Sequence, residues 1–98
     1  MRIRILESAI GDLEAGSDFY NRQEEGVGDY FQDCLFSDID SLVLYGGIHR
    51  QLFGFHRLLS RRFPYAIYYR IEGDVVIVYR VLDCRRDPQR LRRSLGNE

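Results

Sequence analysis

The sequence predicts an α+β domain in the order β-α-α-β-β-β-(α), with an N-terminal helical hairpin packed on a mainly antiparallel sheet. Apolar residues recur at helical spacing through the first half of the chain. From Phe53 onward the period changes, and β-branched and aromatic residues gather in short segments. The chain has 98 residues, a length that suits one domain, 1–98, with one core.

The first segment, 2–6, alternates arginine with isoleucine and predicts a short, half-buried strand. Ser8 follows as a plausible N-cap for a helix over 9–23. Asp12 and Glu14 lie early in this segment, where the helix dipole favours acidic side chains. The N-terminal part of the chain is therefore expected to run from a strand directly into a helix.

The clearest helical signal lies in segment 27–45. Its apolar residues recur at helical spacing, at Val27, Phe31, Cys34, Leu35, Ile39 and Leu42. Gly26 and Gly28 precede most of this stripe, and because glycine inside a helix costs about 1 kcal/mol relative to alanine, they predict a turn between helices. Gly46 and Gly47 mark the end of the segment. We expect an antiparallel helical hairpin with an acidic outer face.

Three segments of the second half predict strands: 55–62, 65–71 and 75–82. Phe63-Pro64 ends the first of them, since proline cannot donate a hydrogen bond to a sheet ladder. Glu72-Gly73-Asp74 predicts the hairpin turn between the other two. After the last strand, a short basic tail over 87–95 predicts a terminal helix, with Asp87 as N-cap and Pro88 at the first helical position.

The register of the last hairpin is predicted from the separation of polar and apolar residues. With Ile71 opposite Val75, one face carries Tyr65, Ile67, Tyr69, Ile71, Val75, Ile77, Tyr79 and Val81, and the other carries Ala66, Tyr68, Arg70, Val76, Val78 and Arg80. We expect the first face to pack on the helices. The second face is expected to present arginines and tyrosines to solvent.

The net charge of −1 conceals a strong asymmetry along the chain. Residues 1–49 carry ten acidic residues and three arginines, whereas residues 50–98 carry eleven arginines and five acidic residues. Such a division suggests a basic face that meets an anionic partner, either a nucleic acid or an acidic protein segment. The alternative is that the two halves form solvated faces that complement each other within one fold.

The composition excludes several classes of function. The chain has no lysine, which excludes Schiff-base chemistry and a Walker P-loop. Two cysteines are too few for a disulfide-dense scaffold or an all-cysteine zinc site. No apolar run approaches the ~20 residues of a membrane span, and the N-terminus lacks the apolar stretch of a signal peptide. We therefore expect a cytoplasmic protein with no membrane partner, no metal and no cofactor.

About forty C-terminal residues carry a recognisable pattern. It consists of RRFPYAIYYR at 61–70, a turn, an apolar strand over 75–82, and Arg85-Arg86-Asp87-Pro88. In this pattern the sequence resembles the RelE/ParE toxin superfamily of bacterial type II toxin–antitoxin systems, whose members are also described as plasmid stabilization proteins. The N-terminal half agrees more loosely, through Gly26-Val27-Gly28 followed by Phe31.

The resemblance implies a toxin that a cognate antitoxin, encoded beside it, neutralises. RelE-like members cut mRNA on the ribosome, whereas ParE-like members bind and poison DNA gyrase without chemistry of their own. The target is thus either DNA gyrase or the ribosome with its mRNA. A third possibility is a decayed member that binds its antitoxin and is not toxic.

The catalytic residues of RelE-like enzymes can be compared with this chain. Cleavage through the RNA 2′-OH requires a base, cations around the phosphate and an acid for the leaving oxygen. RelE-like enzymes typically use two lysines, two arginines and a tyrosine. The resemblance places the lysines at Arg57 and Leu59, the arginines at Ala66 and Arg85, and the tyrosine at Leu91. Only Arg57 and Arg85 keep the charge, and a guanidinium is a poor proton carrier. We therefore expect a ParE-like toxin that acts by binding.

Two sets of candidate site residues follow. For a ribonuclease, we expect Arg57, Arg85 and His56 to be catalytic, with His56 as a substitute base. For binding to a target or an antitoxin, the expected contact residues are Arg57, Arg61, Arg62, Tyr68, Arg80, Arg85 and Arg86. Val76 and Val78 are expected to act as exposed apolar anchors beside Tyr68.

Overall fold

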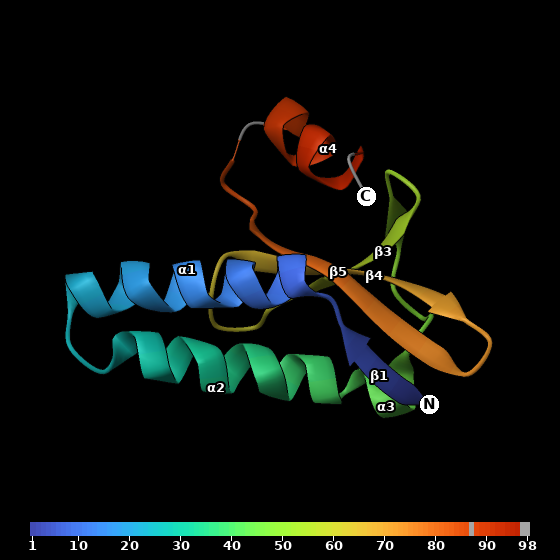
Figure 1. Cartoon of the computed structure of the whole chain (residues 1–98), viewed down its shortest axis with the longest axis horizontal. Helices are drawn as coiled ribbons and strands as arrows, with labels where there is room; N and C mark the ends of the chain where they lie inside the picture. Colours follow the sequence, from blue (N-terminus) through green and yellow to red (C-terminus); the bar gives the residue numbers. More distant parts are fainter. Residues whose placement is uncertain (87, 97–98) are drawn as a thin grey trace.

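The computed structural model describes residues 1–86 and 88–96 (Figure 1). Its elements are β1 (Arg2–Ile5), α1 (Glu7–Gln23), α2 (Val27–Asp40), α3 (Leu42–Tyr45), β2 (Gln51–Leu52), β3 (Phe55–Leu59), β4 (Tyr65–Glu72), β5 (Val75–Asp83) and α4 (Pro88–Gly96). The predicted α+β class and helical hairpin are confirmed. The predicted helix over 27–45 is divided at Ser41 into α2 and α3, β2 had not been predicted, and β3 ends at Leu59 rather than Arg62. Asp87, the predicted N-cap, lies outside the described residues.

The five strands form one open sheet in the order β1-β5-β4-β3-β2. β1 pairs parallel with β5, and the other neighbouring pairs are antiparallel. α1 and α2 lie side by side on one face of the sheet, and α4 lies on the other (Figure 1). Within residues 1–86 and 88–96, no helix has the length and apolar character needed to cross a membrane.

Two glycines allow the helices of the hairpin to approach closely. A Cβ atom on Gly28 would lie 2.0 Å from the carbonyl oxygen of Ser17, and one on Gly16 would lie 2.6 Å from the Phe31 ring. Asn21 Oδ1 accepts a hydrogen bond from the Gly28 amide at 2.8 Å. Gly28, predicted as part of the turn, lies inside α2. A glycine is needed there because the neighbouring helix leaves no room for a side chain.

The main core lies between the helical hairpin and the sheet. Its buried residues are Ala9, Leu13, Phe31, Leu35, Ile39, Leu42, Tyr65, Ile67, Tyr69, Val76, Val78 and Val81. The apolar stripe predicted over 27–45 supplies four of them, so its assignment to the core is confirmed. Burial of one large aliphatic side chain contributes about 1.5–3 kcal/mol to stability, which makes this core the main contributor to the folded state.

The predicted register of the β4–β5 hairpin was wrong by one residue near the turn. Ile71 pairs with Val76, and a β-bulge between Tyr68 and Tyr69 shifts the pairing farther along the strands. The bulge adds one residue on β5, so Val81 keeps its predicted face while the β5 residues nearer the turn exchange faces. Val76 and Val78, predicted as exposed anchors, are consequently buried against the helices.

A second core fills the opposite face of the sheet, beneath α4. It contains Phe55, Ala66, Tyr68, Leu82, Leu91 and Leu95. The prediction of a solvent-exposed face with arginines and tyrosines was wrong, because Leu91 and Leu95 lie four residues apart on one side of α4 and cover the strands. Tyr68, predicted to contact a partner, is 0% exposed.

Polar side chains of α1 cover the part of the β5 edge that β1 leaves unpaired. Ser8, predicted as an N-cap, instead donates to the carbonyl oxygen of Tyr79 at 2.6 Å. Asp12 accepts hydrogen bonds from the Val81 amide at 2.9 Å and from the Arg80 guanidinium at 2.8 and 2.9 Å. Arg80, predicted to contact a partner, is thus held in an internal ion pair.

We predict that Ile67→Ala lowers the free energy of unfolding by about 2–4 kcal/mol, because it opens a cavity in the main core. Ile67 is 0% exposed, whereas Leu44 is 79% exposed. Leu44→Ala therefore serves as the control and should change stability by less than about 0.5 kcal/mol. Urea unfolding of both variants measures the difference, and equal losses would contradict the assignment of the core face.

Candidate binding site at one end of the sheet

Four exposed arginines lie at one end of the sheet, which we call the arginine end: Arg61, Arg62, Arg85 and Arg86. The first two belong to the loop between β3 and β4, and the other two follow β5. The Cys84 amide donates to the carbonyl oxygen of Pro64 at 2.7 Å and holds these two segments together. All four were predicted from the sequence as contact residues, and the fold brings the two pairs to the same end of the molecule.

An aromatic cluster fixes the arginine end to the helical hairpin. The Phe63 ring lies 4.9 Å from that of Tyr20 and 5.1 Å from that of Phe31, measured between ring centroids. Tyr65, the first residue of β4, lies 4.8 Å from Phe31. Such edge-to-face pairs each contribute about 0.5–1.5 kcal/mol beyond the burial of their area. The loop that carries Arg61 and Arg62 is therefore anchored at its far end.

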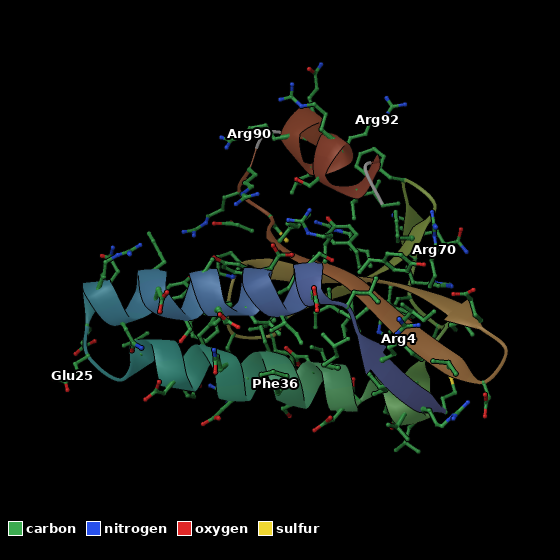
Figure 2. All side chains as sticks on the ribbon, in the orientation of Figure 1. Arg4, Glu25, Phe36, Arg70, Arg90 and Arg92 are labelled. Carbon is green, nitrogen blue, oxygen red and sulfur yellow. The ribbon has the colours of Figure 1, made fainter. Side chains whose placement is uncertain are left out.

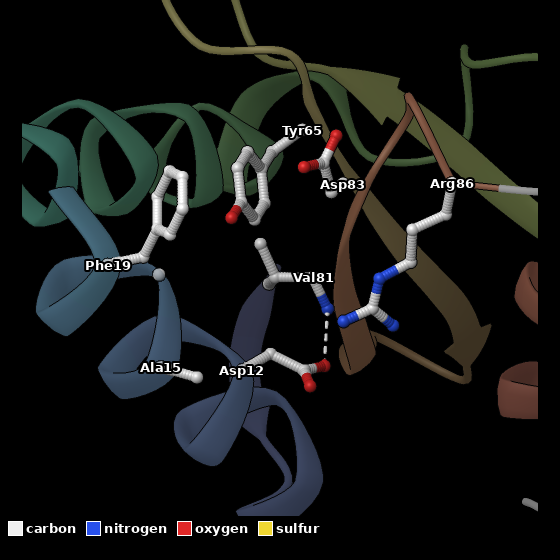
Figure 3. A pocket seen from close by; sticks show the side chains of 8 residues that line it. Asp12, Ala15, Phe19, Tyr65, Val81, Asp83 and Arg86 are labelled. Carbon is white, nitrogen blue, oxygen red and sulfur yellow. Dashed lines mark hydrogen bonds between the residues drawn. The ribbon is translucent and has the colours of Figure 1, made fainter.

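A hollow of about 220 Å³ opens between α1 and the end of β5 (Figure 3). It is lined by Asp12, Ala15, Gly16, Phe19, Tyr65, Val81, Asp83 and Arg86. Figure 3 shows Phe19 and Tyr65 on one side and the Arg86 side chain reaching in from the other. The hollow thus combines aromatic walls with charged groups, and its lining comes from three separate segments of the chain.

The two carboxylates of the hollow are already bonded within the chain. Asp12 binds Arg80, as described above, and Asp83 accepts two hydrogen bonds from the Arg85 guanidinium at 2.9 and 2.7 Å. The hydrogen bonds from Arg85 lower the pKa of Asp83 below its usual value. Burial, and then the charge of Asp83, raise the pKa of Tyr65. At neutral pH the hollow therefore contains two carboxylates that are each paired with a guanidinium, and a protonated tyrosine hydroxyl.

The residues predicted for ribonuclease chemistry are not gathered in one place. Arg57 lies on the α4 side of the sheet, where its Nε donates to Tyr68 Oη at 3.3 Å. His56, its neighbour on β3, stacks on Tyr69 on the helical side, with ring centroids 5.0 Å apart. Arg85 is bonded to Asp83 at the arginine end. Arg57 Nη2 lies 3.5 Å from Sγ of Cys84, the residue before Arg85, so the two arginines lie near the same strand end, whereas His56 is separated from the Arg57 side chain by the sheet.

Both histidines instead hold the loop between α3 and β2 against the sheet. The buried Tyr69 hydroxyl accepts a hydrogen bond from the Gly47 amide at 2.9 Å and bonds to His49 Nδ1. His56 Nδ1 donates to the carbonyl oxygen of His49 at 2.8 Å. Burial, and then the proximity of His56, lower the pKa of His49. His49 is therefore neutral in the folded protein at neutral pH.

Sequence reasoning missed the walls of the hollow. Asp12 was interpreted only through the helix dipole, and its pairing with Arg80 spans 68 residues, so no local pattern indicates it. The pairing of Asp83 with Arg85 had a usable signal, because the two residues lie two positions apart at a strand end. Phe19 carried no signal of exposure within its helical segment.

The family described as ParE toxin of type II toxin-antitoxin system, parDE, matches residues 3–88. Among solved structures, the chain is similar to one titled "Chromosomal ParDE TA system from P. aeruginosa", with a TM-score of 0.73 and 21% sequence identity over 83% of this chain and 92% of that chain. At this identity the structural similarity concerns the fold. The curated proteins gave no match.

We predict that the stability of the protein increases with pH through the titration of His49. Because the fold lowers its pKa, the unfolded chain binds the proton first, so this contribution is complete above the ordinary value of 6.5 and is lost as the pH falls through the folded value. Urea unfolding at about pH 5.5 and 7.5 should show that the free energy of unfolding differs less between the two pH values for His49→Gln than for the unmodified chain. Identical differences would contradict this role.

Proposed function

The chain belongs to the ParE toxin family of type II toxin–antitoxin systems, and we propose that it acts by binding a protein target such as DNA gyrase and is neutralised by a cognate antitoxin. The family match over residues 3–88 carries the proposal. The similar solved structure is titled as a ParDE system, which implies a toxin with a cognate antitoxin. Two features of the fold support the finer parts of the proposal, namely the positions of the candidate catalytic residues and the distribution of charge.

The positions of the candidate catalytic residues favour binding over RNA cleavage. A ribonuclease must place a base, a cation and an acid around one phosphate. Arg57 and His56 lie on opposite sides of the sheet. Leu91, at the place where the resemblance expects a catalytic tyrosine, is buried in the second core. Ribosome-dependent cleavage of mRNA is therefore the alternative function, and the one that the geometry supports less.

The distribution of charge supports an acidic antitoxin. Exposed acidic residues cover the outer side of the hairpin, including Glu25 at its tip, whereas Arg90 and Arg92 on α4 point away from the sheet (Figure 2). The pair with Asp12 largely buries Arg80, whereas Arg85 stays 58% exposed although it pairs with Asp83. The remaining exposed arginines are available to attract an acidic segment, which could fold as it binds.

The proposed contact surface is the arginine end, with Arg61, Arg62, Arg85 and Arg86, together with the half-buried Arg57. Tyr68 and Arg80 leave the set predicted from the sequence, because Tyr68 is buried and the Arg80 side chain is only 21% exposed, whereas Arg85 keeps 58% of its side chain exposed although it binds Asp83. Antitoxin and target would compete for this surface, which explains neutralisation without a separate regulatory site.

We predict that the purified protein inhibits DNA supercoiling by gyrase and leaves mRNA intact on translating ribosomes. The physical reason is that the candidate base, His56, lies on the opposite side of the sheet from the Arg57 guanidinium. Growth, DNA-damage response and mRNA cleavage should be scored together after induction of the chain alone. Cleavage that disappears in Arg85→Ala would establish the ribonuclease alternative, and normal growth with intact antitoxin binding would indicate a non-toxic member.

We also predict that association with the product of the neighbouring antitoxin reading frame slows as salt increases, because opposite charges steer the encounter. Reversal of Arg61, Arg62, Arg85 and Arg86 to glutamate should slow association further. Stopped-flow mixing at low and high salt measures both effects. Reversal of Arg2, Arg4 and Arg22, which lie outside the arginine end, is the control. An association rate indifferent to salt and to the first set of reversals would show that these arginines are only solvated.

A further inference from the structure

One cation that lines the hollow between α1 and β5 is not paired with either carboxylate of the hollow. Asp12 is paired with Arg80, and Asp83 with Arg85, so each carboxylate is matched by one guanidinium. The Arg86 guanidinium has no hydrogen-bond or ion-pair partner among residues 1–86 and 88–96, although it lines the same hollow. The hollow therefore presents one unpaired positive charge at its mouth.

The wall opposite Arg86 is apolar and partly uncovered. Phe19 is 39% exposed, although it lies on a helix that buries other residues against the sheet. Ala15, one turn before it, is also exposed and lines the hollow. The Tyr65 ring completes this wall, and Figure 3 shows both rings facing the space that the Arg86 side chain enters. A ligand group here would meet aromatic carbon on one side and a guanidinium on the other.

These features select a singly charged carboxylate over a phosphate. The Asp12 and Asp83 carboxylates border the space, and although each is paired, they repel a dianion more strongly than a monoanion. A nucleic acid would in addition need several cations spaced along its backbone, whereas the hollow offers one. An acidic protein side chain whose stem or neighbour is apolar matches both the charge and the aromatic wall.

We propose that this hollow is the anchor site for one acidic side chain of the antitoxin, with its carboxylate bonded to Arg86 and its apolar part packed on Phe19 and Tyr65. The inference rests on the proposed function, since it assigns a position to the antitoxin partner. It distinguishes Arg86 from the other arginines at the same end. Arg86 is a specific contact that holds the complex, while the others mainly steer the approach of the partner.

The test compares matched variants in binding to the purified product of the neighbouring antitoxin reading frame. Arg86→Glu should raise the Kd about 10- to 100-fold, mainly through faster dissociation. Arg90→Glu makes the same charge change at an exposed position of α4 outside the hollow and should have a smaller effect. Phe19→Ala should weaken binding more than Phe36→Ala, because the two phenylalanines are 39% and 40% exposed and only Phe19 lines the hollow.

A further variant fills the hollow and leaves Arg86 in place. Ala15→Trp places a large ring at an exposed lining position and should also speed dissociation. Urea unfolding of each variant checks that it is folded. If Arg86→Glu does not fold, the effects of Phe19→Ala and Ala15→Trp on binding test the inference. Failure of the unmodified chain to bind the partner would overturn the proposed function together with this inference. Strong binding by the unmodified chain that Arg86→Glu and Ala15→Trp leave unchanged, or that Arg90→Glu weakens equally, would overturn this inference alone.

Discussion

The ion pair between Asp12 and Arg80 is the interaction on which the arrangement of the rest depends. One carboxylate on α1 accepts two hydrogen bonds from Arg80 and one from the Val81 amide, at the place where β5 has lost its neighbour β1. The same guanidinium donates to the carbonyl oxygen of Ser94 at 3.1 Å. A single half-buried pair thus joins the helical hairpin, the sheet and the last helix. Loss of one partner of such a pair typically costs about 3–5 kcal/mol, because the other charge is left uncompensated.

The pair also explains why both faces of the sheet can be covered in so short a chain. α1 is held along the β5 edge by Ser8 and Asp12, which positions its apolar side over the main core. α4 is held on the other face by Leu91 and Leu95 and by the contact of Ser94 with Arg80. β5 is consequently buried from two sides, and the segment that follows it passes beside the middle of α1. This path brings Arg85 and Arg86 beside the loop that carries Arg61 and Arg62.

The arrangement of charge follows from the same geometry. Arg80 meets Asp12 and is held inside the fold, whereas Arg85 pairs with Asp83 at the surface and keeps 58% of its side chain exposed. Arginines beyond the sheet remain exposed at the arginine end and on α4. A protein that binds a partner through a folded surface needs exposed groups of this kind on a rigid support. Here the support is the aromatic cluster around Phe63 and the hydrogen bond from Cys84 to Pro64.

The sequence by itself determined the helical hairpin and the long strands of the second half, because local periodicity indicates each of them. It also determined the tight turn at Gly73, a glycine that has a φ of 61° in the structure. It also indicated the four arginines of the arginine end, because they flank strand ends. Only the tertiary structure decided that Tyr68, Val76 and Val78 are buried. The residues of β5 near the turn are apolar on both faces, so their pattern does not reveal the bulge that places Val76 and Val78 on the helical side, and the cover provided by α4 is a contact between distant segments. For the same reason the partner of Arg80, 68 residues away, could not be identified from any local pattern.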